Sequence, residues 1–266
     1  MASLENKVIW ITGASSGIGE ALAYELASKN CRLILSARRK DELERVKGNC
    51  KKENQPNIRV LPLDLTLTST LQLSTEAAVQ IFGHIDILIN NGGISQRSLV
   101  KDTSIDVDRK IMEVNYFGAV SLTKFLLPHF IRRKSGHFVV VTSLTGKFGT
   151  PYRSGYAASK HALHGFYDAV RAEHHNDQIH VTMICPGFIH TPITYSALTG
   201  DGTPLNKMDE AQFKGKPPEW CAKKIVKAME RKKEEVYIGG REVWGVYIKR
   251  FFPKVFSRMI RKVAVR

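Results

Sequence analysis

The sequence predicts an α/β protein in which a doubly wound, Rossmann-type parallel sheet of about seven strands carries helices on both faces. Short β-branched runs alternate along the chain with longer amphipathic stretches. The short runs are apolar almost throughout, as strands are when both faces of a parallel sheet are covered. With 266 residues, 43% of them hydrophobic, we expect a single catalytic domain over 1–240 and a tail over 241–266.

The first half of the chain contains four expected strands. "KVIWITG" is the first, and a glycine-punctuated turn separates it from the helical pattern "IGEALAYELASKN". The next helix has a charge-rich helical pattern, and the one after it precedes the strand "IDILINN". These strands are expected at 7–13, 31–37, 58–64 and 85–91, and the helices at 18–30, 41–52 and 68–82.

The second half continues the alternation. It predicts one long helix over 105–132, a helix over 155–175, and strands at 137–143, 179–187 and 234–239. The segment 190–220 is rich in Gly, Pro, Thr and Asp. An irregular stretch of this length inside a compact domain is usually a lid, a binding loop or disordered. As a lid or binding loop it would select the substrate.

The formal net charge is +15, which suggests an anionic partner such as nucleic acid, a membrane surface or a phosphorylated small molecule. The simpler alternative is a well-solvated basic surface. The basic clusters are short and scattered, without zinc-finger spacing or an aromatic-basic RNA-binding pattern, so nucleic acid is not expected. The four cysteines form no CxxC pair, which favours free thiols in a reducing compartment. No metal is expected.

The turn "TGASSGIG" places Gly13, Gly17 and Gly19 between the first strand and the first helix. Gly13 permits the tight turn, Gly17 lets the backbone approach a pyrophosphate at the helix N-terminus, and Gly19 allows close helix–strand packing. A glycine-rich turn alone often reflects only the backbone conformation that the turn requires, without any ligand. Its position between strand and helix favours dinucleotide binding.

The end of the second strand indicates which dinucleotide. An NAD site usually has a carboxylate here for the ribose 2′-hydroxyl, whereas this strand ends in Ala37, Arg38 and Arg39. A guanidinium matches a 2′-phosphate in charge and in its planar fork, which favours NADP. The alternative is that both arginines simply open a helix in solvent.

Tyr156 and Lys160 stand four residues apart in "GYAASKHALHG", on one face of a helix. An ammonium near a tyrosine favours the phenolate, which makes the pair a candidate general acid/base. Taken alone, a tyrosine and a lysine four residues apart are common and can be incidental. Ser143 ends a strand where it can hydrogen-bond a carbonyl oxygen, and Asn115 interrupts an apolar helical stretch, either packing its amide on backbone or holding a water. His161 and His164 are interpreted as ordinary helix residues.

Together these residues resemble the short-chain dehydrogenase/reductase family from Lys7 to about Gly240. The family's TGxxxGxG turn matches Thr12 to Gly19, and its N-N-A-G motif matches Asn90 to Gly93 with Gly in place of Ala. The family's tetrad matches Asn115, Ser143, Tyr156 and Lys160. The cofactor-binding residues that the glycine turn and the resemblance imply are Gly13, Ser15, Ser16, Gly17, Ile18, Gly19, Arg38, Arg39, Asp64, Leu65, Asn91, Gly92, Tyr156, Lys160, Pro186, Gly187 and Thr191.

The resemblance implies an NADP(H)-dependent oxidoreductase that interconverts a ketone or aldehyde and an alcohol. Ser143 would orient the carbonyl, and Tyr156 would protonate its oxygen. Lys160 would hold the nicotinamide ribose and lower the pKa of Tyr156, and Asn115 would support a water linking Lys160 to solvent. A homodimer or homotetramer is the implied assembly.

The tail 241–266 places bulky apolar residues at helical spacing, broken once at Pro253, with basic residues between them. This pattern is typical of a helix on an anionic bilayer, and equally of a stripe that packs on the domain or on a second subunit. The tail resembles the 11β-hydroxysteroid dehydrogenase-like branch, which commonly has an N-terminal membrane anchor. The sequence shows neither such an anchor nor a secretory signal, so a cytoplasmic protein, peripheral to a membrane, is expected.

The branch resemblance and the tail suggest an apolar substrate, such as a steroid, a retinoid or a lipid-derived ketone. One alternative is 3-oxoacyl reduction on an acidic acyl carrier. Another is a cofactor-binding membrane-surface or interaction protein with little turnover, against which the intact tetrad argues. The sequence names neither the substrate nor the reaction direction.

Overall fold

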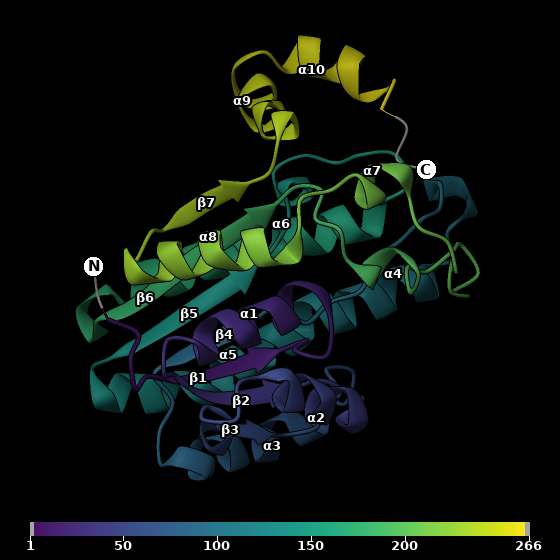
Figure 1. Ribbon diagram of the computed structural model, residues 1–266. Helices are drawn as coiled ribbons and strands as arrows, with labels where there is room; N and C mark the ends of the chain where they lie inside the picture. Colours follow the sequence, from purple (N-terminus) through teal and green to yellow (C-terminus); the bar gives the residue numbers. More distant parts are fainter. Residues whose placement is uncertain (1–2, 264–266) are drawn as a thin grey trace.

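A computed structural model describes residues 3–263 of the chain (Figure 1). Within this range seven parallel strands form one sheet in the order β3-β2-β1-β4-β5-β6-β7, as predicted. The order runs outward from β1 in one direction and from β4 in the other. A crevice therefore opens at the carboxyl ends of these two central strands. The strands are β1 (Val8–Thr12), β2 (Arg32–Ser36), β3 (Ile58–Val60), β4 (Ile87–Asn90), β5 (Gly136–Val141), β6 (Ile179–Pro186) and β7 (Glu235–Ile238).

Helices cover both faces of the sheet because the central strands are apolar on both sides. In β1, Ile9 and Ile11 belong to one buried cluster, and Val8 and Trp10 belong to the other. The helices that pack against the first cluster are α1 (Gly17–Ala27), α2 (Lys40–Asn49) and α8 (Pro218–Glu230). Those that pack against the second are α3 (Thr68–Phe82), α5 (Gly118–Arg133) and α6 (Ser154–Glu173).

The long helix expected over 105–132 is interrupted in the middle. It consists of α4 (Ile105–Met112), a π-helical turn (Glu113–Phe117) and then α5. A π-turn inserts one extra residue into an α-helix. The apolar pattern is helical both before and after it, and the shift in phase between the two parts is too small a signal to be recognised in the sequence. Asn115 lies in this turn.

The segment 190–220 is less irregular than predicted. A short helical turn lies at Pro192–Thr194, α7 spans Glu210–Phe213, and α8 already begins at Pro218. Residues 218–220 are therefore helical and not part of a loop. Proline is favoured in the first helical turn, where its missing N–H costs nothing, so the prolines that suggested a loop mark a helix start.

Two helices follow β7, broken at Pro253 as expected: α9 (Trp244–Phe251) and α10 (Pro253–Ile260). They stand beyond the edge of the layered domain, at the top of Figure 1. Val246 and Phe256 are buried, and the Phe256 ring lies 5.1 Å from the ring of Phe148. The division into 1–240 and 241–266 stays a prediction, and residues 1–2 and 264–266 lie outside the described part. Within residues 3–263, no helix combines the length and the apolar character needed to cross a bilayer.

Candidate functional site

The glycine turn is as tight as its sequence requires. Gly13 and Gly17 have left-handed backbone angles, with φ of 64° and 57°. A Cβ on Gly13 would lie 2.8 Å from the Cα of Gly92, and one on Gly17 would lie 3.0 Å from the Thr191 methyl group. A Cβ on Gly19 would collide with the backbone oxygen of Gly13. Side chains at these positions would therefore force the turn apart from its neighbours. The turn as it stands places Gly13 and Gly17 on the wall of a cavity, which fits close approach by a pyrophosphate.

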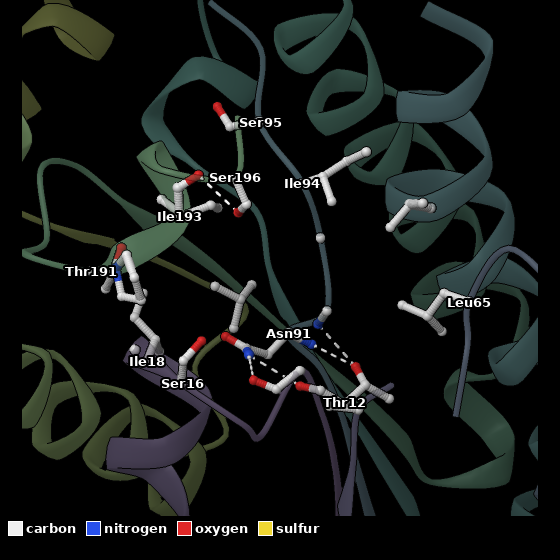
Figure 2. Close-up of a pocket in the computed structure, with 18 of the residues that line it drawn as sticks. Thr12, Ser16, Ile18, Leu65, Asn91, Ile94, Ser95, Thr191, Ile193 and Ser196 are labelled. Atoms are coloured by element: carbon white, nitrogen blue, oxygen red, sulfur yellow. Dashed lines mark hydrogen bonds between the residues drawn. The ribbon is translucent and has the colours of Figure 1, made fainter. Parts of the chain in front are cut away.

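The ends of β1 and β4 are fastened to each other by side chains (Figure 2). The Thr12 hydroxyl accepts hydrogen bonds from the backbone N–H groups of Asn91, at 3.1 Å, and Gly92, at 3.0 Å. The Asn91 amide donates in turn to the carbonyl oxygens of Thr12 and Gly13, at 3.1 and 3.2 Å. A Cβ on Gly92 would meet the end of the Leu65 side chain, Cδ1, at 2.6 Å, so Leu65 would have to move to admit a larger residue.

The same cavity extends past the end of β2. Arg38 and Arg39 line it, and both are exposed. Among residues 3–263 neither arginine forms a salt bridge within 4.0 Å. Asp64 lines the opposite wall, where its carboxylate accepts hydrogen bonds from the Thr66 backbone and hydroxyl, at 2.9 and 2.8 Å.

Ser143, Tyr156 and Lys160 meet at the other end of this cavity. Lys160 is buried, and its ammonium donates to the Val141 carbonyl at 3.0 Å and lies 5.7 Å from the centre of the Tyr156 ring. The Ser143 hydroxyl accepts from the Thr145 backbone at 3.1 Å and hydroxyl at 2.9 Å. A serine, a tyrosine and a buried cation thus converge on one wall.

The charges around Tyr156 differ from the prediction. Burial raises the pKa of Tyr156, while Arg153, the Ser143 hydroxyl and Arg97 lower it. Lys160 is not among the groups that lower it here, although the sequence argument assigned it that role. Burial also lowers the pKa of Lys160, to about 8.

Asn115 does not line the cavity but supports its wall. Its side-chain oxygen accepts from the Ile94 N–H at 2.8 Å, and its amide donates to the Ile94 carbonyl at 3.0 Å and to the Ser159 hydroxyl at 3.0 Å. A Cβ on Gly93 would touch the Asn115 oxygen at 3.0 Å and the Lys160 ammonium at 3.6 Å. Asn115 and Lys160 therefore flank Gly93.

Sequence reasoning did not identify four polar residues next to the tyrosine. Gln96 is fully buried, and its side-chain oxygen accepts from the backbone N–H of Gly155 at 2.8 Å, which fixes the start of α6. Arg97 and Arg153 line the cavity, and both pair with Asp209 from the segment 190–220. A lone glutamine or arginine outside any motif gives no signal in the sequence, because its partner lies more than 50 residues away.

His164, interpreted from the sequence as an ordinary helix residue, lies in α6 among polar neighbours. It is buried beneath the site, where Nε2 lies 3.3 Å from the Thr142 hydroxyl and 3.7 Å from the Cys185 sulfur. Ligand atoms of His164, Cys185 and Glu235 lie within 4.8 Å of one another. The Lys147 ammonium lies 2.6 Å from the Glu235 carboxylate, which therefore already has a cation. All four cysteines are free and buried.

One cavity of about 490 Å³ collects most of the predicted site residues. Gly19 and Asn115 lie behind its wall. The predicted site residues that line it are Gly13, Ser15, Ser16, Gly17, Ile18, Arg38, Arg39, Asp64, Leu65, Asn91, Gly92, Ser143, Tyr156, Lys160, Pro186, Gly187 and Thr191. A glycine cradle at a sheet switch point, joined to a Ser–Tyr–Lys wall, is the site of a nicotinamide-dependent oxidoreductase.

Comparisons with known proteins agree with this class. A family model described as short chain dehydrogenase matches residues 7–201, and the chain belongs to this family of oxidoreductases. The chain is 44% identical over 267 aligned residues to the Dehydrogenase/reductase SDR family protein 7-like of Anopheles gambiae, covering 98% of this chain and 84% of that protein. It is 47% identical over 239 residues to the human Dehydrogenase/reductase SDR family member 7, covering 88% and 70% of the two chains.

Solved structures match the fold. A short chain dehydrogenase/reductase from Burkholderia phymatum in complex with NAD superposes with a TM-score of 0.83 at 21% identity, covering 96% of each chain. An alcohol dehydrogenase from the archaeon Thermococcus sibiricus, complexed with 5-hydroxy-NADP, has a TM-score of 0.75 at 26% identity, covering 88% of this chain and 97% of that one.

Proposed function

We propose that the chain interconverts a carbonyl compound and an alcohol with NADP(H), and that Tyr156 is the general acid or base. The observation that carries this is the convergence of Ser143, Tyr156 and Lys160 on the cavity that the glycine turn opens. When bound, the cofactor supplies or accepts the hydride. The groove at Gly13, Gly17 and Gly19 would hold its pyrophosphate, and Lys160 would hold the ribose next to the nicotinamide.

The side chains have separate tasks in the proposed reaction. The Ser143 hydroxyl donates a hydrogen bond to the carbonyl oxygen and so fixes its position. The Tyr156 hydroxyl gives its proton to that oxygen during reduction and takes it back during oxidation. Arg153 and Arg97 place positive charge near the phenol, which favours proton release. The Lys160 ammonium, 5.7 Å from the centre of the ring, is proposed to add to this effect. Asn115 holds Ile94 and Gly93 in place, and the proposed water between Asn115 and Lys160 would return the proton from solvent.

The proposal includes an apolar substrate and membership of the 11β-hydroxysteroid dehydrogenase-like branch of the family. Ile94, Val114, Ile189 and Ile193 line the same cavity as the tyrosine, which suits an apolar carbon skeleton of the steroid, retinoid or lipid-ketone kind. The test is an NADPH-consumption screen over ketosteroids, retinaldehyde, acyl ketones and quinones. If none of these carbonyl compounds is turned over, the apolar-substrate proposal fails.

Arg38 and Arg39 are proposed to select NADP over NAD. A hydrogen bond between charged groups is worth about 1.5–3 kcal/mol, or roughly tenfold to a hundredfold in affinity. The double variant Arg38→Ala/Arg39→Ala is therefore expected to weaken NADPH binding by that factor and to leave NADH binding nearly unchanged. Fluorescence titration of both cofactors measures this.

Arg32→Ala is the matched control for this pair, because Arg32 is an exposed arginine at the opposite end of β2. It should leave both affinities unchanged. The proposal is wrong if the wild-type protein binds NADH more tightly than NADPH.

The tail is proposed to lie on the surface of an anionic membrane in the cytoplasm. Phe251 and Phe252, 69% and 63% exposed, are flanked by Lys249, Arg250 and Lys254. Rings that enter the acyl boundary, with cations at the headgroups, would bind such a surface. Phe251→Ser/Phe252→Ser is expected to reduce cosedimentation with phosphatidylserine vesicles at least tenfold, given about 1.5–3 kcal/mol for each buried ring.

The control for the membrane experiment is Leu73→Ser on α3, a 68% exposed apolar residue on a different element. Equal vesicle binding by the double variant and the wild-type protein would contradict the membrane proposal. Gel filtration of the same double variant also shows whether these rings instead pack in the proposed homodimer or homotetramer.

A further inference from the structure

Two buried guanidinium groups stand next to the proposed acid, and they share a single carboxylate oxygen. Arg97 contacts Oδ2 of Asp209 through Nε at 2.7 Å and Nη2 at 2.6 Å, whereas Nη2 of Arg153 reaches the same atom only at 3.4 Å. The side chains of Arg97, Arg153 and Asp209 are only 5%, 9% and 4% exposed. Two positive charges and one negative charge leave this wall with an excess of one positive charge.

Arg153 is the incompletely paired member. Arg97 also donates to the Ser95 hydroxyl at 2.8 Å and to the Gln96 carbonyl at 2.6 Å, so its donors are largely used. In contrast, the buried Nε–H of Arg153 finds no hydrogen-bond partner among residues 3–263. A buried N–H without a partner costs free energy. The Arg153 guanidinium therefore keeps unused donor capacity, and its side chain lines the cavity that holds Tyr156.

The pKa of Arg153 also indicates that the charge of its guanidinium is incompletely balanced. Burial and the neighbouring Arg97 lower the pKa of Arg153 to about 10, although guanidinium groups normally stay charged far above that value. The guanidinium lies 5.8 Å from the centre of the Phe188 ring, which gives its face an apolar neighbour. An anion placed beside it would offset the cost of this burial.

We propose that Arg153, supported by Arg97, binds a carboxylate of the substrate, so that the chain reduces oxo acids: carbonyl compounds with an apolar skeleton and a carboxylate group. This rests on the proposed function and names its substrate class. The pair already holds one carboxylate, that of Asp209, so the chemistry of the site matches the group inferred. Arg153 precedes Tyr156 by three residues, and both line the same cavity. A carboxylate on Arg153 would thus fix the distance between the acid group of the substrate and its reacting carbonyl.

The test separates binding from turnover by using hexanoate and hexanamide, which have nearly the same shape but differ in charge. Isothermal titration calorimetry of each compound into the full chain, with and without NADPH, is expected to show hexanoate binding at least tenfold more tightly. Arg153→Met replaces the guanidinium by an unbranched apolar side chain. It should abolish the difference in affinity between hexanoate and hexanamide. Asp209→Asn removes the internal carboxylate and should strengthen hexanoate binding.

Arg171→Met is the control, since Arg171 lies on the same helix, α6, also has a buried Nε–H without a partner among residues 3–263, and pairs with Asp168 at 2.8 Å, but is not among the residues that line the cavity. It should leave both compounds unaffected. Equal binding of hexanoate and hexanamide, no hexanoate binding at millimolar concentration, or an unchanged preference in Arg153→Met would overturn the proposal. Hexanoate binding without turnover of any carbonyl compound would instead locate the failure in the proposed reaction.

Discussion

Replacing Tyr156 by Phe is expected to lower turnover of an accepted carbonyl compound by about 10²–10⁴-fold, the usual contribution of a positioned general acid. The variant loses only the hydroxyl group that would protonate the substrate oxygen. The ring keeps its place because the backbone N–H of Gly155 remains bonded to Gln96. Steady-state NADPH consumption at saturating substrate measures the loss.

The affinity for NADPH should change little in Tyr156→Phe, which separates a lost acid from a damaged cofactor site. Tyr195→Phe is the matched control, since Tyr195 also lines the cavity but is 48% exposed and has no proposed role in proton transfer. Near-normal turnover in Tyr156→Phe would refute the assignment of the acid.

Replacing Gly19 by Ala is expected to weaken NADPH binding at least tenfold. The added methyl group would collide with the backbone oxygen of Gly13 and approach the Asn91 amide at 2.6 Å. Neither of these can move freely, because the Asn91 amide is bonded to the same turn. Overpacking of this kind costs about 1–3 kcal/mol, and the displaced backbone is the surface on which the pyrophosphate would lie. Fluorescence titration with NADPH gives the affinity, and thermal unfolding gives the stability.

Gly48→Ala is the matched control for Gly19→Ala, because an added methyl group has room at this glycine. Among the described residues no heavy atom lies within 4 Å of a Cβ at Gly48, which is inside α2. This variant should bind NADPH normally and gain roughly 0.5–1 kcal/mol in the free energy of unfolding, as alanine does over glycine in a helix. Unchanged NADPH affinity in Gly19→Ala would show that the turn does not hold the cofactor.

The parts of the site that the sequence predicts are those with local chemical causes. Gly13, Gly17 and Gly19 must lack a side chain because of close contacts within and beside one turn. The strand that precedes them is apolar because helices cover both faces of the sheet. The missing carboxylate at Ala37 is also a local fact. Such features keep their meaning whatever the rest of the chain does.

The features that the sequence does not predict depend on distant segments. Asp209 becomes important only when the segment 190–220 folds back over Arg97, and Gln96 only when it meets the start of α6. The cations that lower the pKa of Tyr156 come from these same contacts. Helical spacing and the family resemblance selected Lys160 but gave no sign of the two arginines. Pro218 starts a helix although proline usually suggests a break, because only the context of α8 distinguishes the two cases.

The π-turn at Glu113–Phe117 makes chain length part of the site. In an α-helix each residue advances by about 100° around the axis, so one extra residue changes the angular phase of everything that follows it. The Asn115 amide lies inside this turn and bonds to the Ile94 backbone from there. Deleting Glu113, which precedes Asn115 in the turn, would change the angular phase of Asn115 and is expected to turn the amide away from Ile94, even with every side chain of the tetrad retained. Residue identity and residue count are therefore separate requirements on this helix.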